Sequence, residues 1–270
     1  MNRIDRRFSD LRKRARKALI PFITAGDPSP AFTVKAMHGL VEAGADLLEL
    51  GVPFSDPMAD GPVIQRASER ALAHKVNLAQ VIEFVREFRR KDPQTPVILM
   101  GYLNPIESIG YRNFVEAAAS AGVDGVLTVD MPFEEARELT SLLKEAEIAP
   151  IFLLAPNTSS ERIRKVAEVG SGFLYYVSLK GVTGASHLNL ADVEQKVRQI
   201  RDDTTWPIGV GFGVKNADVA VAIARIADAV VVGSALISRI ESALDQHRTE
   251  PEIHDVITRL LHSMRVAMDS

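Results

Sequence analysis

The sequence predicts an α/β fold: a (β/α)8 TIM barrel formed by one domain, residues 1–270, with extra N-terminal and C-terminal helices. Short apolar runs alternate with longer amphipathic segments roughly eight times over about 250 residues, as in barrels of this class. The apolar runs are nearly continuous, which is typical of parallel strands covered on both faces. No Pro/Ser-rich linker, low-complexity tract or charge block divides the chain, so a single domain is expected.

Strands and helices can be placed along the chain from these patterns. We expect strands at residues 19–24, 47–51, 97–100, 125–129, 150–154, 173–178, 208–211 and 229–232. We expect helices at residues 6–17, 29–42, 78–90, 134–147, 163–169, 216–225, 235–244 and 251–268. In the second helix, Phe32, Ala36 and Leu40 share one apolar stripe. The helix at 134–147 opens with acidic residues, which the helix dipole favours, and residues 158–161 have the form of a capping box.

A doubly wound open sheet is the alternative fold. It usually has fewer strands and a Gly-x-Gly-x-x-Gly turn after the first one. The first turn here reads Thr24-Ala25-Gly26-Asp27-Pro28 and does not match that pattern. The barrel is therefore preferred.

Composition excludes several classes of protein. A net charge of −3 gives no field that would gather nucleic acid, and 25% charged residues argue against disorder. The absence of cysteine removes disulfides, thiolate nucleophiles and cysteine-based metal sites. No apolar run approaches the roughly 18 residues of a membrane helix, and no apolar segment follows the charged N-terminus as in a secretory signal. We therefore expect a cytoplasmic protein with no membrane or nucleic-acid partner.

Two connections that leave strands at their carboxyl ends are unusually long, residues 51–62 and 179–190. In a barrel this end holds the active site, so both loops are candidate lids or partner surfaces. The plainer interpretation is a pair of solvated loops without a role.

Glu49 is the first candidate for chemistry because it interrupts the apolar strand Leu47-Leu48-Glu49-Leu50-Gly51. A carboxylate there must be paired, protonated or held in a wet cavity. Desolvation would raise its pKa and suit it to proton transfer. A structural glutamate bound to a nearby lysine or to a backbone N–H group is the alternative.

Asp56 and Asp60 lie on the loop that leaves the same strand, and either could reach a ligand bound near Glu49. Asp60-Gly61-Pro62 also resembles a helix start, with aspartate as N-cap and proline in the first turn. Read alone, the motif supports the capping role and the catalytic role about equally.

A phosphate site is expected after the seventh and eighth strands, where Gly211-Phe212-Gly213 and Gly233-Ser234 stand. Glycines let backbone N–H groups approach an anion at a helix N-terminus, although tight turns need glycine anyway. Thr183 and Gly184 in the long sixth loop could add a hydroxyl and an N–H group.

An apolar pocket is expected from side chains at or just past strand ends: Phe22, Met100, Leu127, Tyr175 and Phe212. Filling the barrel interior is the alternative for each of them. The six histidines show no metal-ligand spacing, so no catalytic metal is expected.

The longest of these motifs, Leu48-Glu49-Leu50-Gly51-Val52-Pro53-Phe54-Ser55-Asp56-Pro57-Met58-Ala59-Asp60-Gly61-Pro62, resembles the signature of the tryptophan synthase alpha subunit family. Further segments agree in order: Pro21-Phe22-Ile23-Thr24-Ala25-Gly26-Asp27-Pro28, Tyr102-Leu103-Asn104-Pro105, Ile148-Ala149-Pro150-Ile151-Phe152, Gly181-Val182-Thr183-Gly184 and Gly211-Phe212-Gly213. The resemblance spans nearly the whole chain.

The resemblance implies a lyase that cleaves indole-3-glycerol phosphate to indole and glyceraldehyde 3-phosphate by a retro-aldol reaction, without a metal or organic cofactor. It implies that Glu49 is the acid/base and that Asp60 hydrogen-bonds the indole N–H and stabilises its positive charge. It also implies that the indole pocket is formed by Phe22, Met100, Leu127 and Phe212, with Tyr175 beside them. The phosphate is implied to bind to Gly184, Gly213 and Ser234, with backbone support from Gly211 and Gly233. Thr183 is implied to take part in loop closure.

The family also implies a partner, a beta subunit that carries pyridoxal phosphate, in an alpha2beta2 heterotetramer. The residues expected to face it are Pro53, Asp56, Pro57, Asn104, Pro105 and Asp130. Three alternatives remain: a stand-alone lyase of the same fold, a non-catalytic barrel that binds a sugar phosphate, and another phosphate-using barrel such as an isomerase.

Overall fold

Eight parallel strands close into a barrel in the computed structural model, which describes residues 2–177, 189–211 and 213–270. Each strand pairs with the next in sequence order, and the last pairs with the first, Ala18 opposite Ala229. The strands are β1 (Ala18–Thr24), β2 (Leu48–Gly51), β3 (Val97–Gly101), β4 (Gly125–Thr128), β5 (Ala149–Leu154), β6 (Leu174–Val177), β7 (Ile208–Gly211) and β8 (Ala229–Val232). The predicted (β/α)8 barrel is confirmed, and closure excludes the open sheet.

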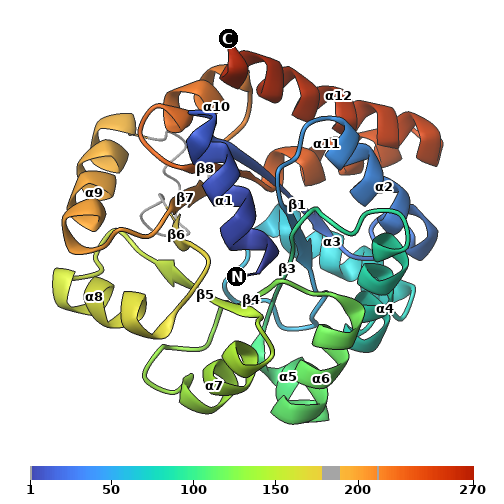
Figure 1. The fold of residues 1–270 in the computed structure, drawn as a ribbon. Coiled ribbons are helices and arrows are strands. Elements are labelled where there is room, and N and C mark those ends of the chain that lie inside the picture. Colours follow the sequence, from blue (N-terminus) through green and yellow to red (C-terminus); the bar gives the residue numbers. More distant parts are fainter. Residues whose placement is uncertain (1, 178–188, 212) are drawn as a thin grey trace.

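Helices surround this barrel on the outside, and the first helix of the chain lies across one end of it (Figure 1). They are α1 (Arg3–Lys13), α2 (Pro30–Glu42), α3 (Pro62–Ala73), α4 (Leu78–Arg89), α5 (Leu103–Ile109), α6 (Tyr111–Ala121), α7 (Arg137–Glu145), α8 (Ser160–Val169), α9 (Leu190–Asp203), α10 (Ala217–Ala224), α11 (Ser234–Asp245) and α12 (Glu250–Asp269). The expected terminal helices are present as α1 and α12.

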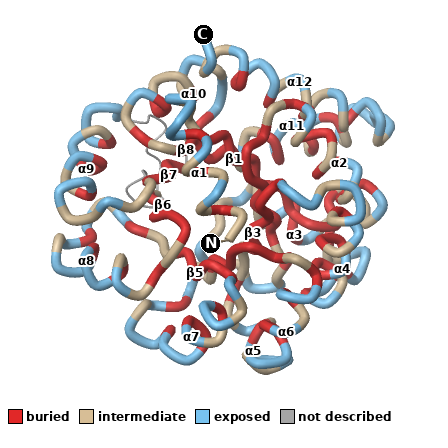
Figure 2. The backbone as a smooth tube through the Cα atoms, in the orientation of Figure 1, coloured by how far each residue is buried: buried red, intermediate tan, exposed pale blue. Residues whose placement is uncertain are grey.

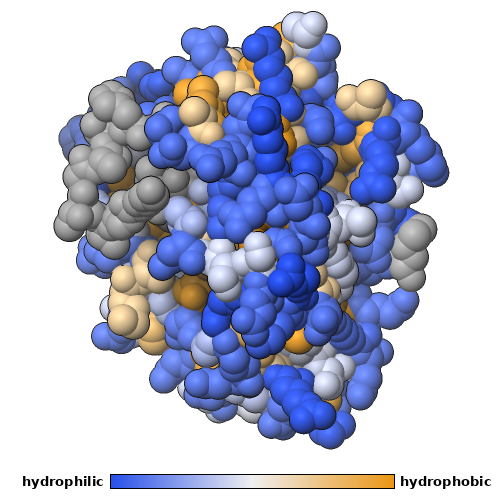
Figure 3. Space-filling model, turned by 90° about the vertical axis from the view of Figure 1, so that its left-hand side faces the viewer, coloured by the Kyte–Doolittle hydropathy of each residue, from blue (hydrophilic) through white to orange (hydrophobic). Residues whose placement is uncertain are grey.

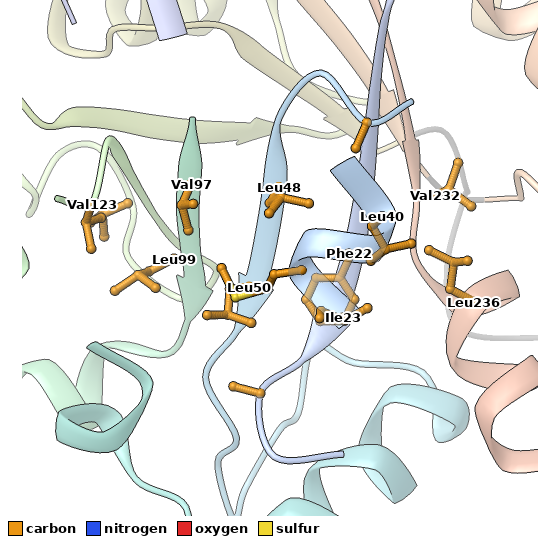
Figure 4. Packing of buried hydrophobic residues seen from close by; sticks show 14 of the residues in the cluster. Phe22, Ile23, Leu40, Leu48, Leu50, Val97, Leu99, Val123, Val232 and Leu236 are labelled. Carbon is orange, nitrogen blue, oxygen red and sulfur yellow. The ribbon is translucent and has the colours of Figure 1, made fainter. Parts of the chain in front are cut away.

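The strands are apolar on both faces because both faces are covered. All seven residues of β1 and all four of β8 are buried, and the buried backbone in Figure 2 follows the strands and the inner sides of the helices. Between barrel and helices, Leu48, Leu50, Val97 and Leu99 of the strands lie in one packed layer with Leu40 of α2 and Leu236 of α11 (Figure 4). Burial of this apolar layer is the main driving force for closing the fold.

The amino-terminal end of the barrel is closed by α1, which crosses it in Figure 1. Ile4, Phe8 and Leu11 on one face of α1 are buried in a cluster with residues at the starts of the strands. The ring of Phe8 lies 5.6 Å from that of Phe173, just before β6. The opposite, carboxyl end is therefore the end that can admit a substrate.

Three helices differ from the sequence prediction by three residues or more at one end or both: α1, α7 and α8, which begins at Ser160 rather than at residue 163. α1 begins at Arg3 because Asn2 and Asp5 form a capping box, and it ends at Lys13, before Ala15 takes a φ of 53°. α7 begins only at Arg137, because the acidic residues expected in its first turn lie in turns closed by Pro132 and Phe133 carbonyls. Acidic residues near a helix start therefore did not fix its first residue.

Two helices have an N-cap other than the residue that the sequence pattern indicated. The N-cap of α3 is Gly61, with Pro62 in the first turn, so Asp60 does not cap this helix. The N-cap of α8 is Ser159, whose hydroxyl accepts from the Arg162 N–H, and no capping box forms with Glu161. The Asp60 carboxylate is consequently available for another role.

The outer face in Figure 3 carries mainly hydrophilic side chains with scattered apolar ones. None of the helices in the described ranges combines the length and the apolar character needed to cross a bilayer.

Candidate active site

A cavity of about 250 Å³ opens at the carboxyl ends of the strands. Its walls come from distant parts of the chain, since parallel strands bring the loops that follow them to one end of the barrel. The lining residues are Phe22, Glu49, Asp60, Gly61, Pro62, Val63, Ile64, Met100, Tyr175, Gly213, Val214, Val231, Gly233 and Ser234. Most of this wall is apolar, and among the described residues its carboxyl groups are those of Glu49 and Asp60.

Glu49 lines the cavity from β2, with Phe22 of β1 and Ile98 of β3 in register beside it. Its side chain is 1% exposed, and neither carboxyl oxygen has a hydrogen-bond partner in the described structure. Burial without a compensating charge raises the pKa of Glu49 to about 8. The structural partner considered as the alternative, a lysine or a backbone N–H group, is absent among the described residues, and the group is mostly protonated at neutral pH.

Asp60 lies half-buried on the loop after β2, with its carboxylate held by a tyrosine. The Tyr102 hydroxyl donates to Asp60 Oδ2 at 3.1 Å and accepts the Ala59 N–H at 3.0 Å. Burial raises the pKa of Asp60, and the hydrogen bond from Tyr102 opposes that shift by stabilising the ionised form. The two carboxyl groups of the cavity therefore have different surroundings.

Two glycines make room for the aromatic walls. A Cβ atom on Gly211 would lie 2.3 Å from the Tyr175 hydroxyl, and one on Gly51 would lie 2.5 Å from Phe22 Cζ. Both contacts are far shorter than van der Waals distance, so any side chain at these positions would displace a ring. Tyr175 is buried near Glu49, and desolvation first, then the charge of Glu49, raises the pKa of its phenol well above the ordinary value.

The turns after β7 and β8 form the polar corner of the cavity. Gly213 has a φ of +79°, in the left-handed region that favours glycine, and it lines the cavity with Gly233 and Ser234. Ser234 is the first residue of α11, so the N-terminus of this helix, where the first N–H groups have no acceptor within the helix, lies at the same corner.

Eight of the predicted substrate-site residues line this one cavity: Phe22, Glu49, Asp60, Met100, Tyr175, Gly213, Gly233 and Ser234. Gly211 lies at the end of β7 against the Tyr175 ring rather than in the wall. Leu127 is not in the wall either: it is 1% exposed and packs in the barrel interior, so its predicted pocket contact is not observed. Thr183, Gly184 and Phe212 lie outside the described residues.

The residues expected to face a partner differ in exposure. Asp56, Asn104 and Asp130 are exposed, and Pro57 and Pro105 are partly exposed. Asp130 Oδ1 accepts the Leu103 N–H at 2.8 Å, which ties the loop after β4 to the start of α5. Pro53 is buried in this chain, so its side chain is not part of an exposed surface, contrary to expectation.

Two residues were missed by sequence reasoning. Tyr102 was noted only within a motif, although its place directly after β3 is a signal for the carboxyl end of the barrel. Met58, on the loop between Glu49 and Asp60, is 85% exposed, more than the other exposed large apolar residues of the described structure, Ile109, Leu190 and Val266. Within the described ranges, no three His, Asp or Glu residues lie close enough together to hold a metal ion.

A closed parallel barrel with an apolar cavity at the carboxyl ends of its strands defines a (β/α)8-barrel enzyme. A family model described as tryptophan synthase alpha chain matches residues 8–265. The chain belongs to the tryptophan synthase alpha chain family.

Individual relatives agree over the full length. The alpha chain of Methylococcus capsulatus is 62% identical over 270 residues, which is 100% of both chains. A crystal structure of tryptophan synthase subunit alpha from Legionella pneumophila superposes with a TM-score of 0.93 at 45% identity and covers 100% and 99% of the two chains. A chain in the X-ray structure of the tryptophan synthase complex of Pyrococcus furiosus gives 0.81 at 36% identity, over 92% and 97%.

Family membership confirms the predicted activity. The chain is a lyase of tryptophan biosynthesis that cleaves indole-3-glycerol phosphate to indole and glyceraldehyde 3-phosphate. The alpha chain needs no cofactor for this step, and pyridoxal phosphate belongs to the beta subunit. The binding-only barrel and the isomerase are therefore excluded.

Proposed function

We propose that Glu49 moves the protons of this cleavage and that Asp60 stabilises the positive charge that forms on the indole ring. A proton must reach the indole C3 atom, and the glycerol hydroxyl must lose one. The C3–carbon bond then breaks, its electron pair returns to the ring, and the hydroxyl carbon becomes the aldehyde. One group that first gives and then takes a proton serves both events.

The unpaired, buried carboxyl of Glu49 is the observation that carries this assignment. Its pKa of about 8 keeps the proton on the group at neutral pH, ready for donation. After donation, the carboxylate in an apolar cavity is a stronger base than one in water, which favours removal of the hydroxyl proton.

Asp60 differs because Tyr102 donates a hydrogen bond to its carboxylate. That bond supports the ionised form, which can accept the indole N–H and offset the charge created by protonation at C3. Phe22 and Met100 would contact the flat ring together with Phe212, beside Tyr175. Gly213, Gly233 and Ser234 would bind the phosphate with Gly184. Thr183 would meet the Asp60 loop on closure.

The test uses Glu49→Gln and Asp60→Asn, which keep shape and remove the charge or the transferable proton. Each purified variant is supplied with indole-3-glycerol phosphate, and free indole is measured. We expect native circular dichroism spectra and a loss of cleavage of roughly three orders of magnitude or more. Turnover within tenfold of the unaltered chain in either variant contradicts its assigned role.

The partner is proposed to be a beta subunit in an alpha2beta2 assembly in the cytoplasm. The Pyrococcus furiosus relative is known from a tryptophan synthase complex, and the exposed residues Asp56, Asn104 and Asp130 all lie at the carboxyl end of the barrel. Light scattering of the purified mixture should give the mass of two chains of each kind. The stand-alone alternative requires that the isolated chain cleave substrate at full rate without the beta subunit.

A further inference from the structure

Positive charge is concentrated in the first 17 residues. Eight of them are lysine or arginine and two are aspartate, a net charge of +6 in a chain whose total is −3. The remaining 253 residues therefore carry a net charge of −9. Most of the basic segment is α1, which lies across the end of the barrel opposite the active site (Figure 1).

A second cavity, of about 430 Å³, lies beside α1 and is larger than the active-site cavity. It is lined by Arg3, Arg6, Arg7, Asp10, Leu11, Arg14, Arg16, Pro93 and Gln94. Five of these nine residues are arginines, and the single acid among them, Asp10, has Lys13 at 3.6 Å. We call this space the arginine cavity.

Two of the five guanidinium groups are fixed in place. Arg3 donates to Asp124 at 2.9 Å and to the Pro93 carbonyl at 2.7 Å. Arg16 contacts Asp46 at 3.3 Å and Asp269 at 3.1 Å. Asp124 and Asp46 are both buried, so these arginines are oriented before any ligand arrives.

The other three arginines have no carboxylate partner in the described structure. Arg6 and Arg14 are exposed and Arg7 is half-buried, and on α1 the positions 3, 6, 7, 10 and 14 share one face. Arg7 influences buried Asp46 at longer range but forms no ion pair with it among the described residues. Four of these five positions are arginine and one is Asp10, so repulsion between like charges dominates on this face. The cluster is stabilised when an anion enters.

We propose that the arginine cavity is a binding site for a small anion with several phosphate groups, separate from the site of cleavage. A concave site of this volume suits a nucleotide-sized molecule. Guanidinium groups bind phosphate oxygens in pairs of parallel hydrogen bonds, and three uncompensated ones match a chain of phosphates better than a single carboxylate. Inorganic polyphosphate and a nucleoside triphosphate share this chemistry.

The test is calorimetric titration of the full chain with sodium tripolyphosphate and, separately, with magnesium-free ATP. Saturating glycerol 3-phosphate is present throughout to occupy the active-site cavity. The test variant carries Arg6→Gln, Arg7→Gln and Arg14→Gln. The matched control carries Arg112→Gln, Arg137→Gln and Arg239→Gln, which remove the same charge from exposed positions on α6, α7 and α11 that likewise form no ion pair in the described structure.

We expect the unaltered chain and the control to bind alike, and the test variant to bind roughly 100-fold more weakly. Equal affinity for the two anions would show that the phosphate chain is what the site recognises. Tighter binding of ATP would indicate a further contact with the nucleoside. A melting scan without anion should show the test variant more heat-stable than the control, because repulsion on α1 is relieved. Absence of binding to the unaltered chain, or equal loss in the control, overturns the proposal.

Discussion

The Glu49 carboxyl group is desolvated on folding and gains no hydrogen bond in the described structure. Its contribution to the stability of the folded state therefore depends on pH. Its pKa rises from the ordinary 4.5 to about 8. Between these values the unfolded chain releases this proton and the folded chain keeps it, so this group makes stability fall as pH rises. Glu49→Gln removes that dependence, and we expect the variant to gain roughly a few kcal/mol over the unaltered chain across this window.

Urea denaturation of both proteins at pH 5 and pH 8.5 measures this effect. Glu145→Gln at an exposed position of α7 is the control, and it should not gain stability with pH. Parallel pH dependences of the Glu49→Gln variant and the unaltered chain would show that the carboxyl is not held neutral by burial.

Tyr102 is expected to affect cleavage through its hydrogen bond to Asp60. Tyr102→Phe removes the hydroxyl that donates to Asp60 Oδ2, and this hydrogen bond lowers the Asp60 pKa. Without it the pKa rises and less Asp60 is ionised at a given pH, so the acidic limb of the pH profile of kcat/KM should move to higher pH. We expect a loss of roughly tenfold near neutral pH that recovers partly in more alkaline buffer.

The matched control is Tyr111→Phe, because Tyr111 also donates to a carboxylate, Glu107, but at an exposed site on α5 and α6. It should leave the profile unchanged. A uniform loss in Tyr102→Phe at every pH, without movement of the limb, would mean that the ring only packs, against Phe54 for example.

Residues differ in how far their roles can be predicted from sequence. Glu49 could be predicted because a carboxyl within an apolar strand has few physical explanations. Tyr102 could not, since its contact depends on the loop after β2 folding over the end of β3. Leu127 was assigned to the pocket because strand position alone does not give depth in the barrel, and the structure buries it in the interior.

At the scale of elements, α3 and α11 are joined by a network of ion pairs. Arg70 of α3 donates to both carboxylate oxygens of buried Asp27 at 2.7 and 2.9 Å, and to Glu241 of α11 at 3.3 Å. α3 carries Val63 and Ile64 of the cavity wall, and α11 begins at Ser234. The network therefore fixes the position of α3, on the proposed indole side of the cavity, relative to α11, on the proposed phosphate side.

Arg70→Met should be strongly destabilising because it leaves the Asp27 carboxylate buried without its partner. Burial already raises the pKa of Asp27 despite the charge and hydrogen bonds of Arg70, so pairing with Arg70 only partly compensates for the desolvation of the carboxylate. We expect a loss of roughly 3–5 kcal/mol in the free energy of unfolding, measured by urea denaturation, and a higher KM because both walls shift.

Arg66→Met provides the comparison, since Arg66 binds the same Glu241 from an exposed position, and it should cost far less. The double variant Asp27→Asn/Arg70→Met should recover part of the lost stability. If all three variants are equally stable, the network does not hold the helices together.

The strands were easier to predict than the helices for a physical reason. Strands buried on both faces show as continuous apolar runs, and all eight were found within about two residues of their ends. Four helices were missed: α3, α5, α6 and α9. Of these, α5 and α6 are separated by the single residue Gly110, with a φ of +82°, so their pattern is interrupted where two helices meet.

At the scale of the whole molecule, closure of the barrel separates two ends with different chemistry. α1 seals the amino-terminal end and bears the arginine cavity, while the carboxyl end has the two carboxyl groups and the exposed loop after β2. The number of strand–helix repeats predicted closure, but the sequence did not indicate which loop residues remain exposed. Pro53 and Met58 of one loop show this, since the first is buried and the second is not.

Met58 supplies the last prediction, which concerns assembly. Its side chain is 85% exposed between Glu49 and Asp60 in sequence, beside exposed Asp56, so a partner that covers this loop would bury it. Met58→Ser should weaken binding of the beta subunit roughly tenfold, the effect expected when a methionine loses most of its buried area. Cleavage by the isolated chain should be unchanged, because Met58 does not line the cavity. The matched control is Val266→Ser, a 52% exposed apolar residue of α12, which should bind normally. Titration of each variant with the beta subunit, read as mass by light scattering and as indole release, separates the two effects. Equal affinity of both variants would place the partner elsewhere on the barrel, whereas loss of isolated turnover in Met58→Ser would mean that the loop acts in cleavage and not only in assembly.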